Sequence, residues 1–102
     1  MRIALTGCLV PAPEALAMGM VSEVVSDERT LPRALELAAQ IAALPPLAVA
    51  QIKEVMLLGA DLPLDSALAL ERKAFQLLFD SRDQKEGASA FLEKRKASFL
   101  GE

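Results

Sequence analysis

Proline and glycine divide this chain of 102 residues into short segments, and in most of them the apolar residues recur every three or four positions. That spacing lines apolar side chains along one face of a helix. In the clearest segment the repeat covers three turns, at Leu31, Ala34, Leu35, Ala38, Ile41 and Ala42. Ala and Leu, which dominate the apolar composition, are strong helix formers. The sequence therefore predicts an all-α fold of five or so helices with one short extended segment.

Local signals set the expected helix boundaries. Gly7 suits the left-handed residue that closes a helix, Asp27 is a plausible N-cap, and Ser81 with Gln84 matches the S-x-x-Q capping box. The last helix is expected to run to about Lys96, so that the cations of residues 94–96 lie in its final turn. The expected helices cover about residues 3–5, 14–18, 28–44, 46–59, 64–80 and 82–96.

The extended segment is the valine-rich stretch at residues 20–25. No second stretch of this kind is present to pair with it, and an unpaired strand leaves backbone donors and acceptors open. The first predicted helix, at residues 3–5, is also a single turn that begins almost at the initiator residue. Both features lead us to expect that the chain belongs to a longer fold.

Charge and hydropathy argue against two classes of partner. The formal net charge of −3 differs from the basic surplus of nucleic-acid-binding proteins. No apolar run approaches the roughly 20 residues that span a bilayer, and residues 1–8 are too short for a secretion signal. We therefore expect a cytoplasmic protein with neither nucleic acid nor membrane as its partner.

The chain has no histidine and one cysteine, Cys8. These counts exclude a Cys-cluster metal site and any Ser-His-Asp or Cys-His catalyst built from this chain alone, and we expect Cys8 to be structural. Acid–base chemistry would fall to carboxylates or lysines. Glu71 interrupts an apolar face and is expected to pair with a nearby Arg or Lys, whereas Glu14 and Glu86 are expected to be first-turn or surface charges. We predict no catalytic residue and no metal ligand.

Four stretches, taken in order, resemble the C-terminal part of the crotonase family, the enoyl-CoA hydratases and isomerases. The first is L-T-G at residues 5–7, and the second, at residues 12–25, is similar to the pattern A-x-E-A-x-x-x-G-L-V-x-x-V. The third, at residues 45–54, follows P-P-x-A-V-x-x-x-K. The fourth, at residues 71–96, follows E-x-x-x-F … D-x-x-E-G-x-x-A-F-x-E-K-R-K. Two residues depart from the family pattern: Cys8 stands where a basic residue is common, and Ala88 where Met is common.

The resemblance implies a division of labour within a larger enzyme. In this family the two backbone N–H groups of the oxyanion hole, and the glutamates that move protons, precede the L-T-G element. Residues 1–25 would then be the end of the core-domain portion, and residues 26–102 the helical region used in trimer-type assembly and in covering CoA. The parent enzyme would hydrate 2-enoyl-CoA in fatty-acid metabolism, with acyl-CoA as its substrate and no separate cofactor. The 102-residue chain alone would be inactive.

Two residues would contact CoA bound to a neighbouring subunit, by their position in the motifs. Phe75 would pack on the adenine, and Lys94 would meet a phosphate as a point charge. Each also has a simpler interpretation: Phe75 as a core residue on an apolar stripe, and Lys94 as a solvated cation at a helix end. The acyl-chain length and the particular reaction within the family stay open, since the distinguishing residues lie upstream.

Two rival interpretations stay open at the level of the sequence. The chain could be a free-standing helical module that binds another protein through its apolar faces, with no catalytic role. It could also be a complete, active hydratase.

Overall fold

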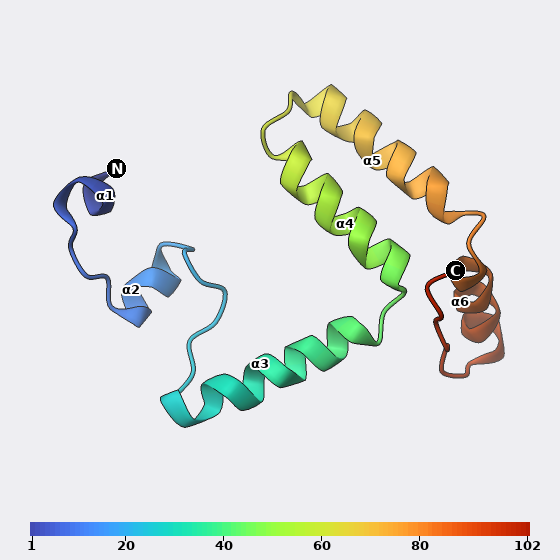
Figure 1. The fold of residues 1–102 in the computed structure, drawn as a ribbon, viewed down its shortest axis with the longest axis horizontal. Helices are drawn as coiled ribbons and strands as arrows, with labels where there is room; N and C mark the ends of the chain where they lie inside the picture. The colour runs from blue at the N-terminus through green and yellow to red at the C-terminus, as the bar shows by residue number, and fades with distance from the viewer. The chain divides into compact units, whose positions relative to one another are not determined.

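The computed structural model describes all 102 residues and contains helices but no strand (Figure 1). This confirms the predicted all-α fold, and each of the six helices corresponds to one of the expected ranges. The helices are α1 (Arg2–Thr6), α2 (Ala12–Ala17), α3 (Asp27–Ala42), α4 (Pro46–Gly59), α5 (Leu64–Leu78) and α6 (Arg82–Glu93). The chain divides into two compact units, Met1–Leu35 and Glu36–Glu102, which are described in turn.

In the first unit, glycines end the two short helices. Gly7 adopts φ 62°, and its backbone N–H donates to the Ile3 carbonyl at 2.9 Å, which is the left-handed ending expected from the sequence. Gly19, with φ 73°, follows α2 in the same way. Residues 20–25, predicted to be extended, are not helical and form no strand. The Arg33 guanidinium binds the carboxylate of Glu23 across this segment, with an Nε–Oε1 distance of 2.9 Å.

The helix α3 begins one residue earlier than the capping signal suggested. Asp27 is its first helical residue, while the carbonyl of Ser26 accepts from the Arg29 N–H at 2.9 Å. The prediction of Asp27 as the N-cap is therefore wrong by one position. Hydrogen bonds from the Glu28 backbone and from Ser26 lower the pKa of the Glu28 carboxyl. Negative charge in this first turn is favourable because the N-terminal end of a helix dipole is positive.

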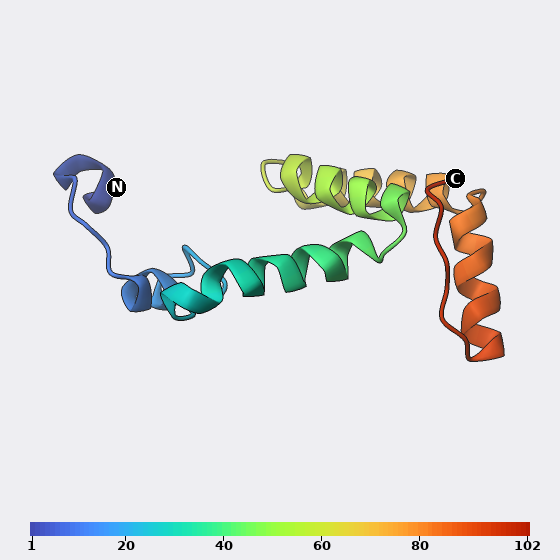
Figure 2. The same ribbon diagram turned by 60° about the horizontal axis from the view of Figure 1, so that its bottom comes forward.

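In the second unit, α4 and α5 lie side by side and antiparallel in both ribbon views (Figures 1 and 2). Pro46 occupies the first turn of α4, where a missing backbone N–H is harmless. Near the turn of the hairpin the two helices approach closely, since a Cβ added at Gly59 would lie 3.6 Å from the Cβ of Ala67. The helix α5 ends at Leu78, two residues before the predicted boundary.

Ser81 caps α6 as the S-x-x-Q pattern predicted, and its hydroxyl accepts from the Gln84 N–H at 3.1 Å. The far end differs from the prediction. The helix stops at Glu93, so the cations at residues 94–96 do not lie in its last turn, and that prediction is wrong. Residues 95–102, called the tail below, turn back and run beside α6 (Figure 2).

The helices of each unit cover very little of their apolar surface. The buried apolar residues are Ala15, Ala74 and Ala90, all with the smallest hydrophobic side chain. The α3 stripe predicted from the sequence is present but exposed at Leu31, Leu35 and Ile41. Burial of a Leu or Ile side chain is worth about 1.5–3 kcal/mol, and most of that stabilisation is not realised within the chain. No single helix is long and apolar enough to cross a membrane, although the bent pair α3 and α4 reaches that length and composition together.

We therefore expect the isolated chain to associate with itself. Sedimentation velocity at low micromolar concentration should show species larger than a monomer, because association removes the exposed Leu, Ile and Phe side chains from water. A compact monomer that binds no hydrophobic dye would contradict this expectation.

Candidate functional site

An open groove of about 470 Å³ lies on the α4–α5 hairpin of the second unit. Its apolar lining comes from both helices, at Ile52, Val55, Met56, Leu68, Phe75 and Leu78. Gln51, Glu71 and Arg72 supply polar atoms at the groove. Glu71 is exposed and forms no ion pair, so the prediction that it pairs with a nearby Arg or Lys is wrong. The groove offers apolar contact, with few polar groups to orient a reacting molecule.

Phe75 is the aromatic residue that borders this groove, and 61% of it is exposed. Its ring meets Phe79 edge-on, with the centroids 5.0 Å apart and the planes at 86°. Phe75 also lines a second hollow, of about 370 Å³, together with Leu47 and Phe99. An aromatic face that is fixed by a neighbouring ring and open to solvent can stack on a flat ligand.

Lys94 has an unusual backbone conformation, with φ 54° and ψ 36°. Its N–H donates to the Phe91 carbonyl at 3.3 Å, and the Arg95 N–H donates to the Ala90 carbonyl at 3.0 Å. These two bonds make the Schellman motif, in which glycine usually occupies the left-handed position. A side chain in that conformation costs roughly 1–2 kcal/mol. Lysine therefore stands where the backbone alone favours glycine.

Arg95, the first residue of the tail, ties the tail to α6. Its Nη1 and Nη2 donate to the two oxygens of Glu86 at 2.6 and 2.8 Å, and its Nε donates to Glu93 Oε2 at 2.6 Å. Glu86 also accepts from the Ser98 N–H at 2.9 Å. The hydrogen bonds from Arg95, and after them that from Ser98, lower the pKa of Glu86 to about 2. The same pairing raises the pKa of the Arg95 guanidinium. Glu86 is therefore a tether, where a plain surface charge had been expected.

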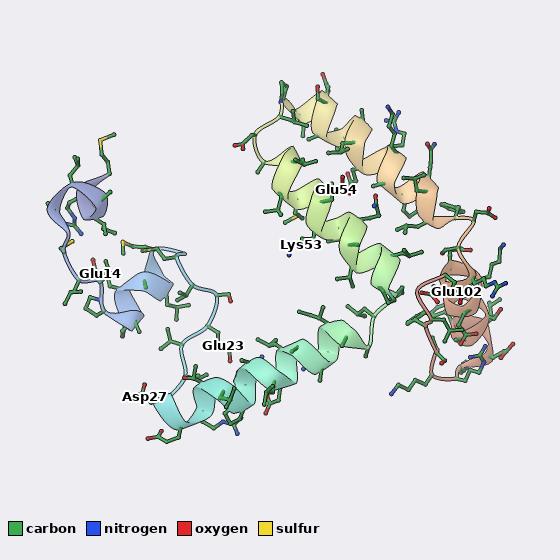
Figure 3. The ribbon with its side chains drawn as sticks, viewed as in Figure 1. Glu14, Glu23, Asp27, Lys53, Glu54 and Glu102 are labelled. Atoms are coloured by element: carbon green, nitrogen blue, oxygen red, sulfur yellow. The ribbon has the colours of Figure 1, made fainter.

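A second carboxylate, Asp83, holds the end of the tail. Asp83 is 3% exposed, and its two oxygens accept from the N–H groups of Leu100 and Gly101 at 2.7 and 2.8 Å. In return, the main-chain oxygen of Glu102 accepts from the Arg82 N–H at 2.7 Å and from the Asp83 N–H at 3.2 Å. The Glu102 carboxylate, labelled in Figure 3, binds Arg82 Nη1 at 2.6 Å. The tail thus occupies the open N–H groups of the first turn of α6.

Two glycines allow the tail to lie close. Gly101 has φ 80°, and a Cβ there would meet Pro46 Cγ at 3.5 Å, so the tail reaches the start of α4. At Gly87 an added Cβ would lie 3.5 Å from the Phe99 ring. Asp83, Glu86 and Gly87 therefore form one surface of α6 that faces the tail. Their i, i+3, i+4 spacing was a usable signal in the sequence, but its meaning depended on a segment whose path the sequence did not reveal.

The structure does not bring the two predicted CoA-contacting residues together. Phe75 lies on α5, Lys94 follows α6, and the two line no common hollow. Lys94 is exposed, as is Phe91 one turn earlier, at 83%. No group of three or more Cys, Asp or Glu side chains has an arrangement that could hold a metal ion.

A sequence profile described as enoyl-CoA hydratase/isomerase matches residues 1–102. The chain is 43% identical over 99 residues to a probable enoyl-CoA hydratase of Rhizobium meliloti, a match that covers 97% of this chain and 38% of that protein. It is 41% identical over 95 residues to a crotonyl-CoA hydratase of Syntrophomonas wolfei, covering 93% of this chain and 36% of the relative. The chain thus spans less than two-fifths of the length of these relatives.

Solved structures agree with the sequence matches. An enoyl-CoA hydratase subunit from Geobacillus kaustophilus superposes with a TM-score of 0.89 at 47% identity, over 95% of this chain and 38% of that one. An enoyl-CoA hydratase/isomerase from Mycobacterium paratuberculosis gives a TM-score of 0.92 at 32% identity, over 99% of this chain and 41% of that one.

The Glu86–Arg95 pair predicts a measurable titration. The folded-state pKa of about 2 lies below the ordinary value of 4.5, so the stabilisation from the pair is fully present above pH 4.5. It is lost as the pH falls through about 2. A carboxyl-carbon NMR titration should give that low pKa, and Arg95→Gln should return it towards 4.5.

Arg82→Gln, which removes the neighbouring ion pair with Glu102, is the matched control and should leave the Glu86 titration unchanged. An ordinary Glu86 pKa in the unaltered chain would show that the pair does not persist in solution.

Proposed function

Since the chain belongs to the enoyl-CoA hydratase/isomerase family, we propose that it is the C-terminal helical region of an enzyme that hydrates 2-enoyl-CoA. The order of the four motif stretches supports this proposal most strongly. They end in D-x-x-E-G and E-K-R-K at residues 83–87 and 93–96, the pattern with which the family closes. The match to 38% and 36% of the two curated relatives is consistent with one region of a longer fold.

In this proposal the chain supplies binding and assembly, and the preceding part of the enzyme supplies the chemistry. Hydration of an enoyl thioester needs donors aimed at the developing enolate oxygen and carboxylates placed to transfer protons. The two carboxylates best fixed in the second unit are both occupied: Asp83 accepts from the N–H groups of Leu100 and Gly101, and Glu86 accepts from Arg95 and the Ser98 N–H. They are tethers, and acid–base catalysis is assigned to residues upstream of residue 1. Residues 1–25 then end the core-domain portion, and 26–102 form the helical region.

The exposed apolar faces support a role in assembly. Leu and Phe side chains on α4, α5 and α6 are more than half exposed at Leu57, Leu77, Phe91 and Leu92. Such surfaces are stable when they are covered by the core of the same enzyme or by further copies of it. A homo-oligomer with trimer-type contacts, acting on acyl-CoA without a separate cofactor, fits this surface.

Phe75 and Lys94 are the residues proposed to contact CoA bound to a neighbouring subunit. The exposed, edge-fixed ring of Phe75 suits an adenine face, and the Lys94 ammonium suits a phosphate. Phe75 and Lys94 need not be neighbours for this role, because CoA is an extended molecule. The left-handed backbone of Lys94 adds support, since a residue kept against its backbone preference points to a use for its side chain.

A free-standing helical interaction module is the alternative, favoured by the same exposed apolar faces. The DNA upstream of the Met1 codon separates the two. An in-frame extension that encodes a Gly-rich oxyanion loop and glutamates supports the enzyme region. An in-frame stop codon followed by a ribosome-binding site directly before Met1 contradicts it.

If Lys94 contacts CoA, one substitution should have opposite effects on stability and on binding. In the assembled protein, meaning the proposed full enzyme as a homo-oligomer, Lys94→Gly should raise the free energy of unfolding by about 1 kcal/mol, because glycine accepts φ 54° without strain. It should also weaken acetyl-CoA binding roughly tenfold, since a charge-assisted contact to phosphate is lost. Thermal unfolding and isothermal titration calorimetry measure the two effects.

Lys96→Gly is the matched control, because it removes an exposed cation two residues later without relieving a left-handed backbone. It should bind acetyl-CoA as the unaltered protein does. If the Lys94→Gly and unaltered proteins bind acetyl-CoA with equal affinity, the proposed contact is wrong.

A further inference from the structure

The turn that carries Lys94 is fixed by hydrogen bonds from its own backbone and from the neighbouring Arg95 side chain. The Schellman bonds from Lys94 and Arg95 set the backbone, but they leave the direction of the next residues open. That direction is set by Arg95, whose guanidinium reaches back to Glu86 on α6 through two parallel hydrogen bonds. The geometry is the bidentate arginine–carboxylate arrangement, which restrains orientation as well as distance.

Glu86 is the common point of this arrangement. Its Oε1 receives Arg95 Nη1 at 2.6 Å and the Ser98 N–H at 2.9 Å, and its Oε2 receives Arg95 Nη2 at 2.8 Å. Arg95 and Ser98 lie on the C-terminal side of Lys94, whereas Glu86 precedes it by two turns of α6. The Glu86 carboxylate therefore joins the helix before Lys94 to the residues after it, so the strained Lys94 lies within a closed turn.

We propose that Glu86, acting through Arg95, is a positioning residue that holds the Lys94 ammonium where it meets a phosphate of bound CoA. The inference rests on the proposed CoA contact of Lys94 and adds the residues that fix its place. Without Glu86 the Lys94 turn and the tail lose three of their hydrogen bonds, and the left-handed backbone loses the support that offsets its strain.

A positioning role and a simple charge effect have opposite signs. Glu86→Gln removes a negative charge near an anionic ligand, so long-range electrostatics alone would tighten CoA binding. Loss of positioning weakens it, because the ammonium then spends less time at the phosphate. Asp80→Asn is the matched control: it makes the same charge change at a fully exposed side chain whose ion pair is with Lys85, away from the Lys94 turn.

The test is calorimetric titration of the assembled protein with acetyl-CoA, a saturated thioester that cannot be hydrated, at roughly 0.05 M and 0.5 M salt, over which the Debye length shortens several-fold. We expect Glu86→Gln to weaken binding roughly five- to tenfold at low salt. We also expect Glu86→Gln to reduce the salt dependence of acetyl-CoA binding, as we expect of Lys94→Gly, and to leave the binding stoichiometry unchanged. Asp80→Asn should bind as tightly as the unaltered protein or slightly more tightly.

The outcomes separate the two proposals. If Lys94→Gly weakens binding but Glu86→Gln changes neither affinity nor salt dependence, or lowers only the stoichiometry, Glu86 is structural and the inference is wrong. If Lys94→Gly itself has no effect, the proposed CoA contact fails, and the positioning role fails with it. Arg95→Lys keeps the charge but not the two parallel bonds, and it is judged by the same criteria if Glu86→Gln does not fold.

Discussion

The shortage of buried apolar surface is the constraint on which the rest of this structure depends. Each helix forms for local reasons, such as the Ser81 cap or the glycine endings, yet the buried apolar residues are all alanines. Helices of this length are marginal in water without tertiary packing. The apolar faces of the chain therefore need a covering surface. In the proposed role, the rest of a longer enzyme or further copies of it supply that surface, and the chain matches only 38% of the length of the Rhizobium meliloti relative.

Polar contacts, by contrast, are well developed at one end of the chain. Asp83 and Glu86 use all four of their carboxylate oxygens on the tail and on Arg95, so α6 and the tail hold together without a large apolar core. Hydrogen bonds to charged groups are stronger than neutral ones. Because the pair of Glu86 and Arg95 is partly exposed, water and salt screen it, and its main effect is on geometry. The end of α6 is consequently the best-defined surface on which a ligand contact can be proposed.

Features with a local cause were predictable from the sequence, and features with a distant cause were not. The Gly7 ending and the Ser81 cap follow from residues within one turn, and both were found where the sequence placed them. The end of α6 was misplaced because three consecutive cations suggested a last helical turn, whereas the chain reverses at Lys94 to reach Glu86 and Asp83. The predicted ion pair of Glu71 was also wrong, because an interruption in an apolar face does not reveal which residues lie opposite it.

In the proposed division of labour, this chain contributes binding and assembly but not chemistry. The most direct test of this division is a crotonyl-CoA hydration assay on the purified 102-residue chain, with circular dichroism to show that the helices are present and a mock purification to exclude host hydratase. An intact crotonyl-CoA hydratase, such as the Syntrophomonas wolfei relative, is the positive control. The proposed division of labour predicts no hydration above the mock purification. Turnover by the helical 102-residue chain would contradict it.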